Sequence, residues 1–100
     1  EDLNKAIDLN DAYAEAFLNR GVTFAALNKP TKANLDFSQA IKLRPDFTEA
    51  YKNRAITLMH LGKQKKSCSD LRTASALGNK EVSTWIKEYC KSGNKLRNKN

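Results

Sequence analysis

The sequence predicts an all-α fold, an antiparallel helix-pair solenoid of about six helices that include a C-terminal capping helix. Residues 14–47 and 48–81 align without a gap, and 11 of their 34 positions are identical. Apolar residues recur at helical spacing, while Gly and Pro are scarce, at four and two in 100 residues. A repeat of this fixed length indicates units that bury their apolar faces against their neighbours.

The first complete repeat, residues 14–47, is predicted to hold two helices. Apolar side chains and one glycine recur at helical spacing over residues 14–27. Asn28 then stands where a left-handed residue ends a helix. Pro30 opens the second helix, where its missing N–H costs nothing. Pro45 ends that helix, because the residue before a proline avoids helical geometry.

The second complete repeat, residues 48–81, follows the same plan. Helices are expected near residues 48–60 and 64–77, each with its own apolar stripe. Gly62 takes the place that Asn28 has in the first repeat. The second repeat is the weaker of the two, because Asn79 stands where a proline would end the unit.

Three further segments complete the predicted organisation. Residues 1–13 are the second helix of a truncated leading repeat, because their apolar residues lie 34 positions before those of a second helix. Residues 82–91 form a capping helix with one apolar stripe and a polar opposite face. Residues 92–100 are a basic, flexible tail.

The charge is uneven along the chain. The net charge of +7 divides into six basic and eight acidic residues in the first half, against twelve and three in the second. An excess of this kind suggests either a solvated face or an anionic partner. One alternative function is therefore nucleic-acid or anionic-ligand binding through Lys63, Lys65, Lys66, Arg72 and the tail. No apolar run approaches the roughly 18 residues of a membrane helix.

The repeats resemble the tetratricopeptide repeat (TPR) family, whose pattern combines small, aromatic and Pro residues at fixed offsets. Small residues at Gly21/Ala55 let paired helices approach, and large residues at Phe37/Leu71 fill the space around them. The first repeat carries the pattern in Phe17-x-x-Arg20-Gly21-x-x-Phe24, Ala33-x-x-x-Phe37, Ala40 and Pro45. Arg20 and Arg54, which recur, are expected to pair with Asp36 or Asp70.

The resemblance implies that the first helix of each pair lines a concave groove that binds a peptide or another protein. Asn19 and Asn53 recur one repeat apart, so their amides could bond an extended peptide backbone or simply their own helices. The groove residues expected on this basis are Glu15, Leu18, Asn19, Val22, Glu49, Lys52, Asn53, Ile56 and His60.

A basic clamp for the acidic tails of cytosolic chaperones is not expected. Some TPR proteins hold such tails with Lys and Asn on one first helix and with Lys and Arg on a third. Lys52 is present here, but Ile56 stands where its Asn partner belongs, and there is no third complete pair.

The two cysteines leave two alternatives open. Cys68 and Cys90 each lie 11 residues from Asn79, at the centre of a predicted turn, so an antiparallel hairpin brings them level. They form either a disulfide that pins the capping helix or two buried thiols. The disulfide would favour a periplasmic or secreted location, and free thiols a cytoplasmic one.

These observations predict a non-enzymatic interaction module that binds a protein or peptide partner. No catalytic constellation or phosphate loop stands out, and His60 is the only histidine, so no catalytic residue, metal or cofactor is predicted. A second alternative is self-association through the open N-terminal edge, where residues 1–10 lack a partner helix.

Overall fold

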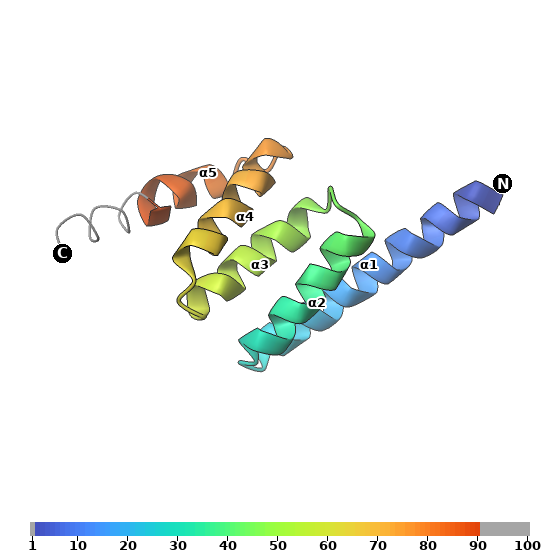
Figure 1. The fold of residues 1–100 in the computed structure, drawn as a ribbon, viewed down its shortest axis with the longest axis horizontal. Coiled ribbons are helices and arrows are strands. Elements are labelled where there is room, and N and C mark those ends of the chain that lie inside the picture. The colour runs from blue at the N-terminus through green and yellow to red at the C-terminus, as the bar shows by residue number, and fades with distance from the viewer. Residues whose placement is uncertain (1, 91–100) are drawn as a thin grey trace.

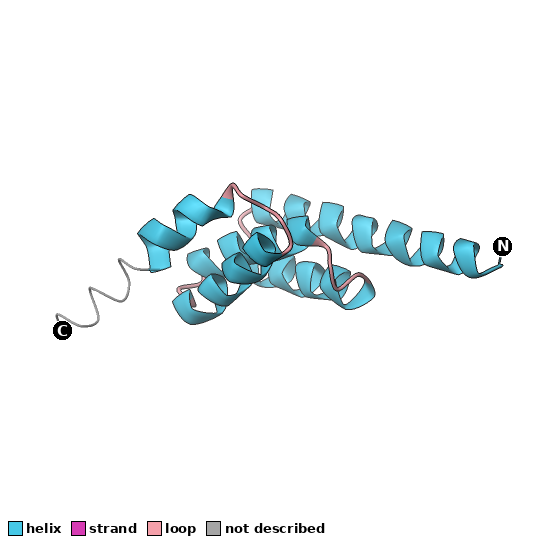
Figure 2. Ribbon diagram, turned by 90° about the horizontal axis from the view of Figure 1, so that it is seen from above, coloured by secondary structure: helices cyan, strands magenta, loops and turns pink. Residues whose placement is uncertain are grey.

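The chain folds into a row of helices (Figure 1). The computed structural model describes residues 2–90, with side chains from residue 10 onward, so the predicted tail at 92–100 lies outside the described residues. Every regular element in the described part is helical (Figure 2). The elements are α1 (Asp2–Ala26), α2 (Pro30–Leu43), α3 (Thr48–His60), α4 (Gln64–Ala76), α5 (Val82–Trp85) and the π-helix η1 (Ile86–Cys90).

The helices stack in chain order, which confirms the predicted all-α solenoid of helix pairs. α1 packs on α2, α2 on α3, and α3 on α4, and the short helices α5 and η1 pack on α4. The cap is defined here as α5 together with η1. Between residues 2 and 90 the structure has no helix with the length and apolar character of a membrane span.

The main difference from the sequence-based prediction lies at the N-terminus. The sequence predicts one helix within residues 1–13 and another from residue 14, whereas α1 runs unbroken from Asp2 to Ala26. The reason is the lack of a helix breaker: Asp11 stands 34 residues before Pro45, the proline that follows α2. The expected open edge is therefore an extension of α1 beyond α2 (Figure 1), not a separate helix.

The C-terminal ends of α1, α3 and α4 share one turn geometry. Asn28, Gly62 and Gly78 have positive φ angles of 60°, 74° and 109°. In each turn the next backbone N–H donates to the carbonyl five residues earlier, at N···O distances of 2.8, 2.8 and 3.0 Å. These bonds satisfy carbonyls that a helix end leaves unpaired. The helix-ending roles predicted for Asn28 and Gly62 are confirmed.

Recurrent arginine–aspartate pairs fasten the two helices of each repeat. Arg20 donates to both carboxylate oxygens of Asp36 at 2.8 and 2.9 Å, and Arg54 to those of Asp70 at 2.7 and 2.9 Å. Arg54 also donates to Ser38 Oγ at 3.1 Å and so joins the two repeats. Hydrogen bonding to the aspartate raises the pKa of each arginine. The predicted intramolecular pairing is confirmed.

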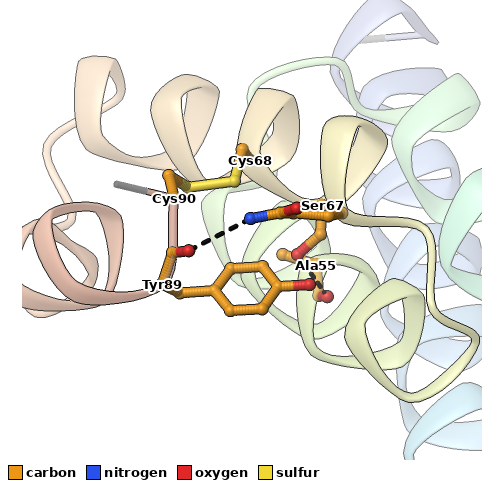
Figure 3. The surroundings of a disulfide bond; sticks show 6 residues. Ala55, Ser67, Cys68, Tyr89 and Cys90 are labelled. Carbon is orange, nitrogen blue, oxygen red and sulfur yellow. Dashed lines mark hydrogen bonds between the residues drawn. A yellow bond between two sulfur atoms is a disulfide. The ribbon is translucent and has the colours of Figure 1, made fainter. Parts of the chain in front are cut away.

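The cap is held to α4 by a covalent bond and a hydrogen bond (Figure 3). A disulfide joins Cys68 on α4 to Cys90 on η1, with 5.9 Å between their Cα atoms. Gln64 Nε2 donates to the backbone carbonyl of Tyr89 at 3.2 Å. The structure therefore has the disulfide, one of the two alternatives that the sequence leaves open.

Candidate functional site

Two cavities open along the first helices of the repeats. The α1/α3 cavity has a volume of about 230 Å³. It contains four of the nine groove residues expected from the sequence, namely Val22, Asn53, Ile56 and His60. Its other lining residues are Ala25, Asn28, Pro30, Phe37 and Thr57.

The α3/cap cavity has a volume of about 330 Å³ and lies on the other side of α3. Its lining residues are Ile56, Met59, Trp85, Glu88 and Tyr89. Ile56 lines both cavities, so they adjoin across the C-terminal half of α3. The two cavities together are called the groove. Its chemistry is apolar with a few polar groups, which is typical of ligand-binding surfaces.

Four of the expected groove residues have partners within the chain. Leu18 packs against a core cluster that joins the first and second repeats. Glu15 lies 3.8 Å from Arg44, and Glu49 lies 3.2 Å from Lys52. Lys52 also reaches Glu81, 29 residues further along the chain, at 3.4 Å. These side chains support the wall of the groove, and none of them lines either cavity.

The ammonium group of Lys52 is stabilised in its charged form. Burial lowers the pKa of Lys52, but the hydrogen bonds and charges of Glu49 and Glu81 outweigh it and leave the pKa above its ordinary value. The side chain is 18% exposed. A lysine held between two carboxylates on its own chain has little remaining capacity to bind an acidic partner.

The two recurrent asparagines differ in position. Asn53 lines the α1/α3 cavity, whereas Asn19 is exposed and lies outside both cavities. Within the side chains that the structure describes, neither amide has a hydrogen-bond partner; only the backbone carbonyls accept bonds, from Thr23 and Thr57. The Asn53 amide is therefore positioned in the cavity with its donors and acceptor available.

Sequence reasoning missed the part of the groove that the cap contributes. Trp85, Glu88 and Tyr89 line the α3/cap cavity, although the sequence indicated only packing and solvent-facing roles for this helix. A signal was present: Trp85 lies 34 residues after Tyr51, which lies 34 after Phe17. The cap thus occupies the place of a third first helix.

Basic residues gather at a different cavity. Lys63 and Lys66 line a polar cavity of about 380 Å³ between α2 and α4, together with the paired Arg54 and Asp70. Its remaining lining residues are Asn34, Ser38, Leu58 and Ser69. In the part of the chain with described side chains, no three His, Cys, Asp or Glu residues are grouped so as to hold a metal ion.

Stacked helix pairs with this turn geometry and these interhelical contacts define a TPR-like helical repeat. The chain is similar to the solved first TPR of Spaghetti (RPAP3) bound to the HSP90 peptide SRMEEVD, with a TM-score of 0.74 and 23% sequence identity. The similarity covers 89% of this chain and 78% of that one. The sequence matches no protein-family model and no curated protein. The likeness in structure confirms the fold that the sequence motifs predict.

Proposed function

We propose that the chain is a non-enzymatic interaction module that binds a peptide segment of a partner protein in the groove. The observation that carries the proposal is the pair of adjoining cavities that share Ile56. Apolar cavities anchor side chains, and the available Asn53 amide can bond the peptide backbone without reading its sequence.

The size of the groove is that of a short extended peptide. Neighbouring helices pack about 8–10 Å apart, so the path from α1 across α3 to the cap spans about 20 Å. An extended chain covers about 3.3 Å per residue, which corresponds to about six residues. The peptide bound to the similar RPAP3 domain has seven residues, SRMEEVD.

The acidic HSP90 peptide itself is a poor candidate for this chain. Lys52, the one lysine among the expected groove residues, is already paired with Glu49 and Glu81. Ile56 stands where the resemblance requires an asparagine. The proposal is therefore a peptide-binding groove of different specificity.

A selection followed by calorimetry tests the proposal. A displayed library of random seven-residue peptides is selected against the chain, and an enriched peptide is titrated into wild type and variants. Ile56→Ala should weaken binding about tenfold or more through lost apolar contact. Asn53→Ala should weaken it about two- to tenfold through one lost hydrogen bond.

The matched control is Leu35→Ala, which truncates an apolar side chain that is 64% exposed on α2. It lines neither cavity, so affinity should stay at the wild-type value. The absence of enriched peptides, or an equal loss of affinity in Ile56→Ala and Leu35→Ala, would contradict the proposal. Melting temperatures of all variants separate loss of binding from loss of folding.

A further inference from the structure

The α3/cap cavity combines an apolar floor with a single charged side chain. Ile56, Met59, Trp85 and Tyr89 provide the apolar surface, and Glu88 is the one ionisable carboxylate that lines it. The neighbouring Lys87 does not line the cavity. Between residues 10 and 90, Glu88 has no salt-bridge partner, and it is exposed. Its carboxylate therefore lies exposed at the edge of the cavity.

The negative charge of Glu88 at this cavity contrasts with the chain as a whole, which carries a net charge of +7. The Lys52 ammonium group lies between the carboxylates of Glu49 and Glu81, at 3.2 and 3.4 Å. Lys52 is thus already paired, and Glu88 is the one charged side chain that lines the α3/cap cavity. Lys63 and Lys66 line the separate cavity between α2 and α4.

We propose that the groove selects a peptide with a large apolar side chain flanked by Lys or Arg. The apolar side chain enters the α3/cap cavity, where it contacts Trp85 and Met59, and the flanking cation pairs with Glu88. This inference rests on the proposed function and specifies the chemistry of the partner. The same charges disfavour a peptide with acidic residues at the flanking positions, because like charges repel at short range.

The expected discrimination is moderate. An exposed ion pair contributes a small free energy, and a like-charge pair opposes binding by a similar amount. Exchanging a flanking Lys for Glu should therefore weaken binding about two- to thirtyfold at low salt. The difference should shrink as salt rises, because added ions screen exposed charges.

The single tryptophan of the chain provides a direct readout of occupancy. Trp85 is half-buried at the cavity, so an apolar side chain placed against it should exclude water and shift its fluorescence emission to shorter wavelength. The probes are a tryptophan-free peptide enriched from the seven-residue library, the same peptide with its cations replaced by Glu, and SRMEEVD. Affinities are measured by calorimetry and cavity occupancy by the emission of Trp85.

A charge reversal at the cavity gives the decisive comparison. Wild type should prefer the cationic peptide over both acidic ones, and Glu88→Lys should abolish or reverse that preference. Asp46→Lys is the control for charge reversal away from the cavity, because Asp46 is exposed in the turn before α3, lines neither cavity of the groove and lies 3.7 Å from Arg44. It should leave the preference at least half as large as in wild type.

The possible outcomes separate this inference from the proposed function. If no library peptide binds, the proposed function fails. If enriched peptides bind but are acidic or indifferent to charge, the groove binds peptides and the inference about its partner is overturned. Equal effects of Glu88→Lys and Asp46→Lys, or a Trp85 emission that binding does not change, would also overturn it.

Discussion

Replacing Gly21 with alanine tests the contact that sets the distance between α1 and α2. A Cβ atom at Gly21 would lie 2.6 Å from Cε1 and 2.8 Å from Cδ1 of Phe37. The Phe37 ring is 1% exposed and borders the α1/α3 cavity on one side. The substitution therefore forces either the ring or the helix to shift.

Two effects of opposite sign determine the magnitude. Overpacking a well-packed core costs about 1–3 kcal/mol. Alanine in a helix interior is favoured over glycine by up to about 1 kcal/mol. The expected net destabilisation of Gly21→Ala is therefore about 1–2 kcal/mol. For a domain of this size, that corresponds to a melting temperature lower by about 4–15 °C.

The second repeat provides the natural comparison. There Ala55 occupies the position of Gly21, and the smaller Leu71 occupies that of Phe37. The double variant Gly21→Ala with Phe37→Leu should consequently recover at least about 1 kcal/mol relative to the sum of the single changes. The control Ala55→Gly makes the reverse change in the second repeat and introduces no clash. It should destabilise the chain by about 1 kcal/mol or more, because it loses helix propensity and the contacts of the Ala55 methyl group.

Urea unfolding followed by circular dichroism gives the free energies of unfolding of wild type, the two single variants, the double variant and Ala55→Gly. The reasoning would be refuted if Gly21→Ala unfolded at the wild-type urea concentration, or if the two changes in the double variant were additive. Either result would show that the Phe37 ring relaxes without cost and does not fix the spacing of the helices.

Four further outcomes are expected. Removing the disulfide with Cys90→Ala should destabilise the chain by about 3 kcal/mol for a separation of 22 residues, measured by urea unfolding. Alkylation of unreduced wild type should label neither Cys68 nor Cys90, and two labelled thiols would contradict the structure. Asp70→Asn should cost about 2 kcal/mol, because it leaves the partly buried Arg54 without its charge partner; a loss below about 0.5 kcal/mol would show that solvent compensates. Since the hydrogen bond to Asp70 raises the pKa of Arg54 above its ordinary value, the stabilisation is complete below the unfolded pKa and is lost only as the pH rises through the folded pKa. The difference between wild type and Asp70→Asn should accordingly stay constant from pH 7 to 10, and a decline in that range would contradict the assignment.

The helix pairs could be predicted from the sequence because the signals for each turn are local. Each signal lies within a few residues of the helix end that it determines. The signals are the left-handed residues Asn28 and Gly62 and the helix-breaking Pro45. The continuity of α1 had a local signal too, the lack of proline at Asp11. The 34-residue repeat concealed the continuity of α1, because it implied a turn near residue 13 that the chain does not form.

The groove was harder to predict because several of its residues acquire partners from distant parts of the chain. On its own helix Lys52 is a solvent-facing cation, and only the folded chain brings Glu81 to it. Leu18 likewise packs against a core cluster to which the second repeat contributes Ala50. Val22 and Ile56 line the α1/α3 cavity, and their role in binding a partner stays a prediction.

The π-helix η1 explains how the cap acts both as a lid on the core and as a wall of the groove. Counting 34 residues from Gly21 and Ala55 leads to Tyr89, yet a tyrosine is too large for the close contact that the two small residues make with their second helices. A π-turn holds one residue more than an α-turn, so it shifts the following side chains by about one position. The smaller Cys90 therefore faces α4 and bonds Cys68, while Tyr89 lines the α3/cap cavity. One inserted residue thus places a small side chain against the core and an aromatic ring at the groove, which an unbroken α-helix with this sequence would reverse.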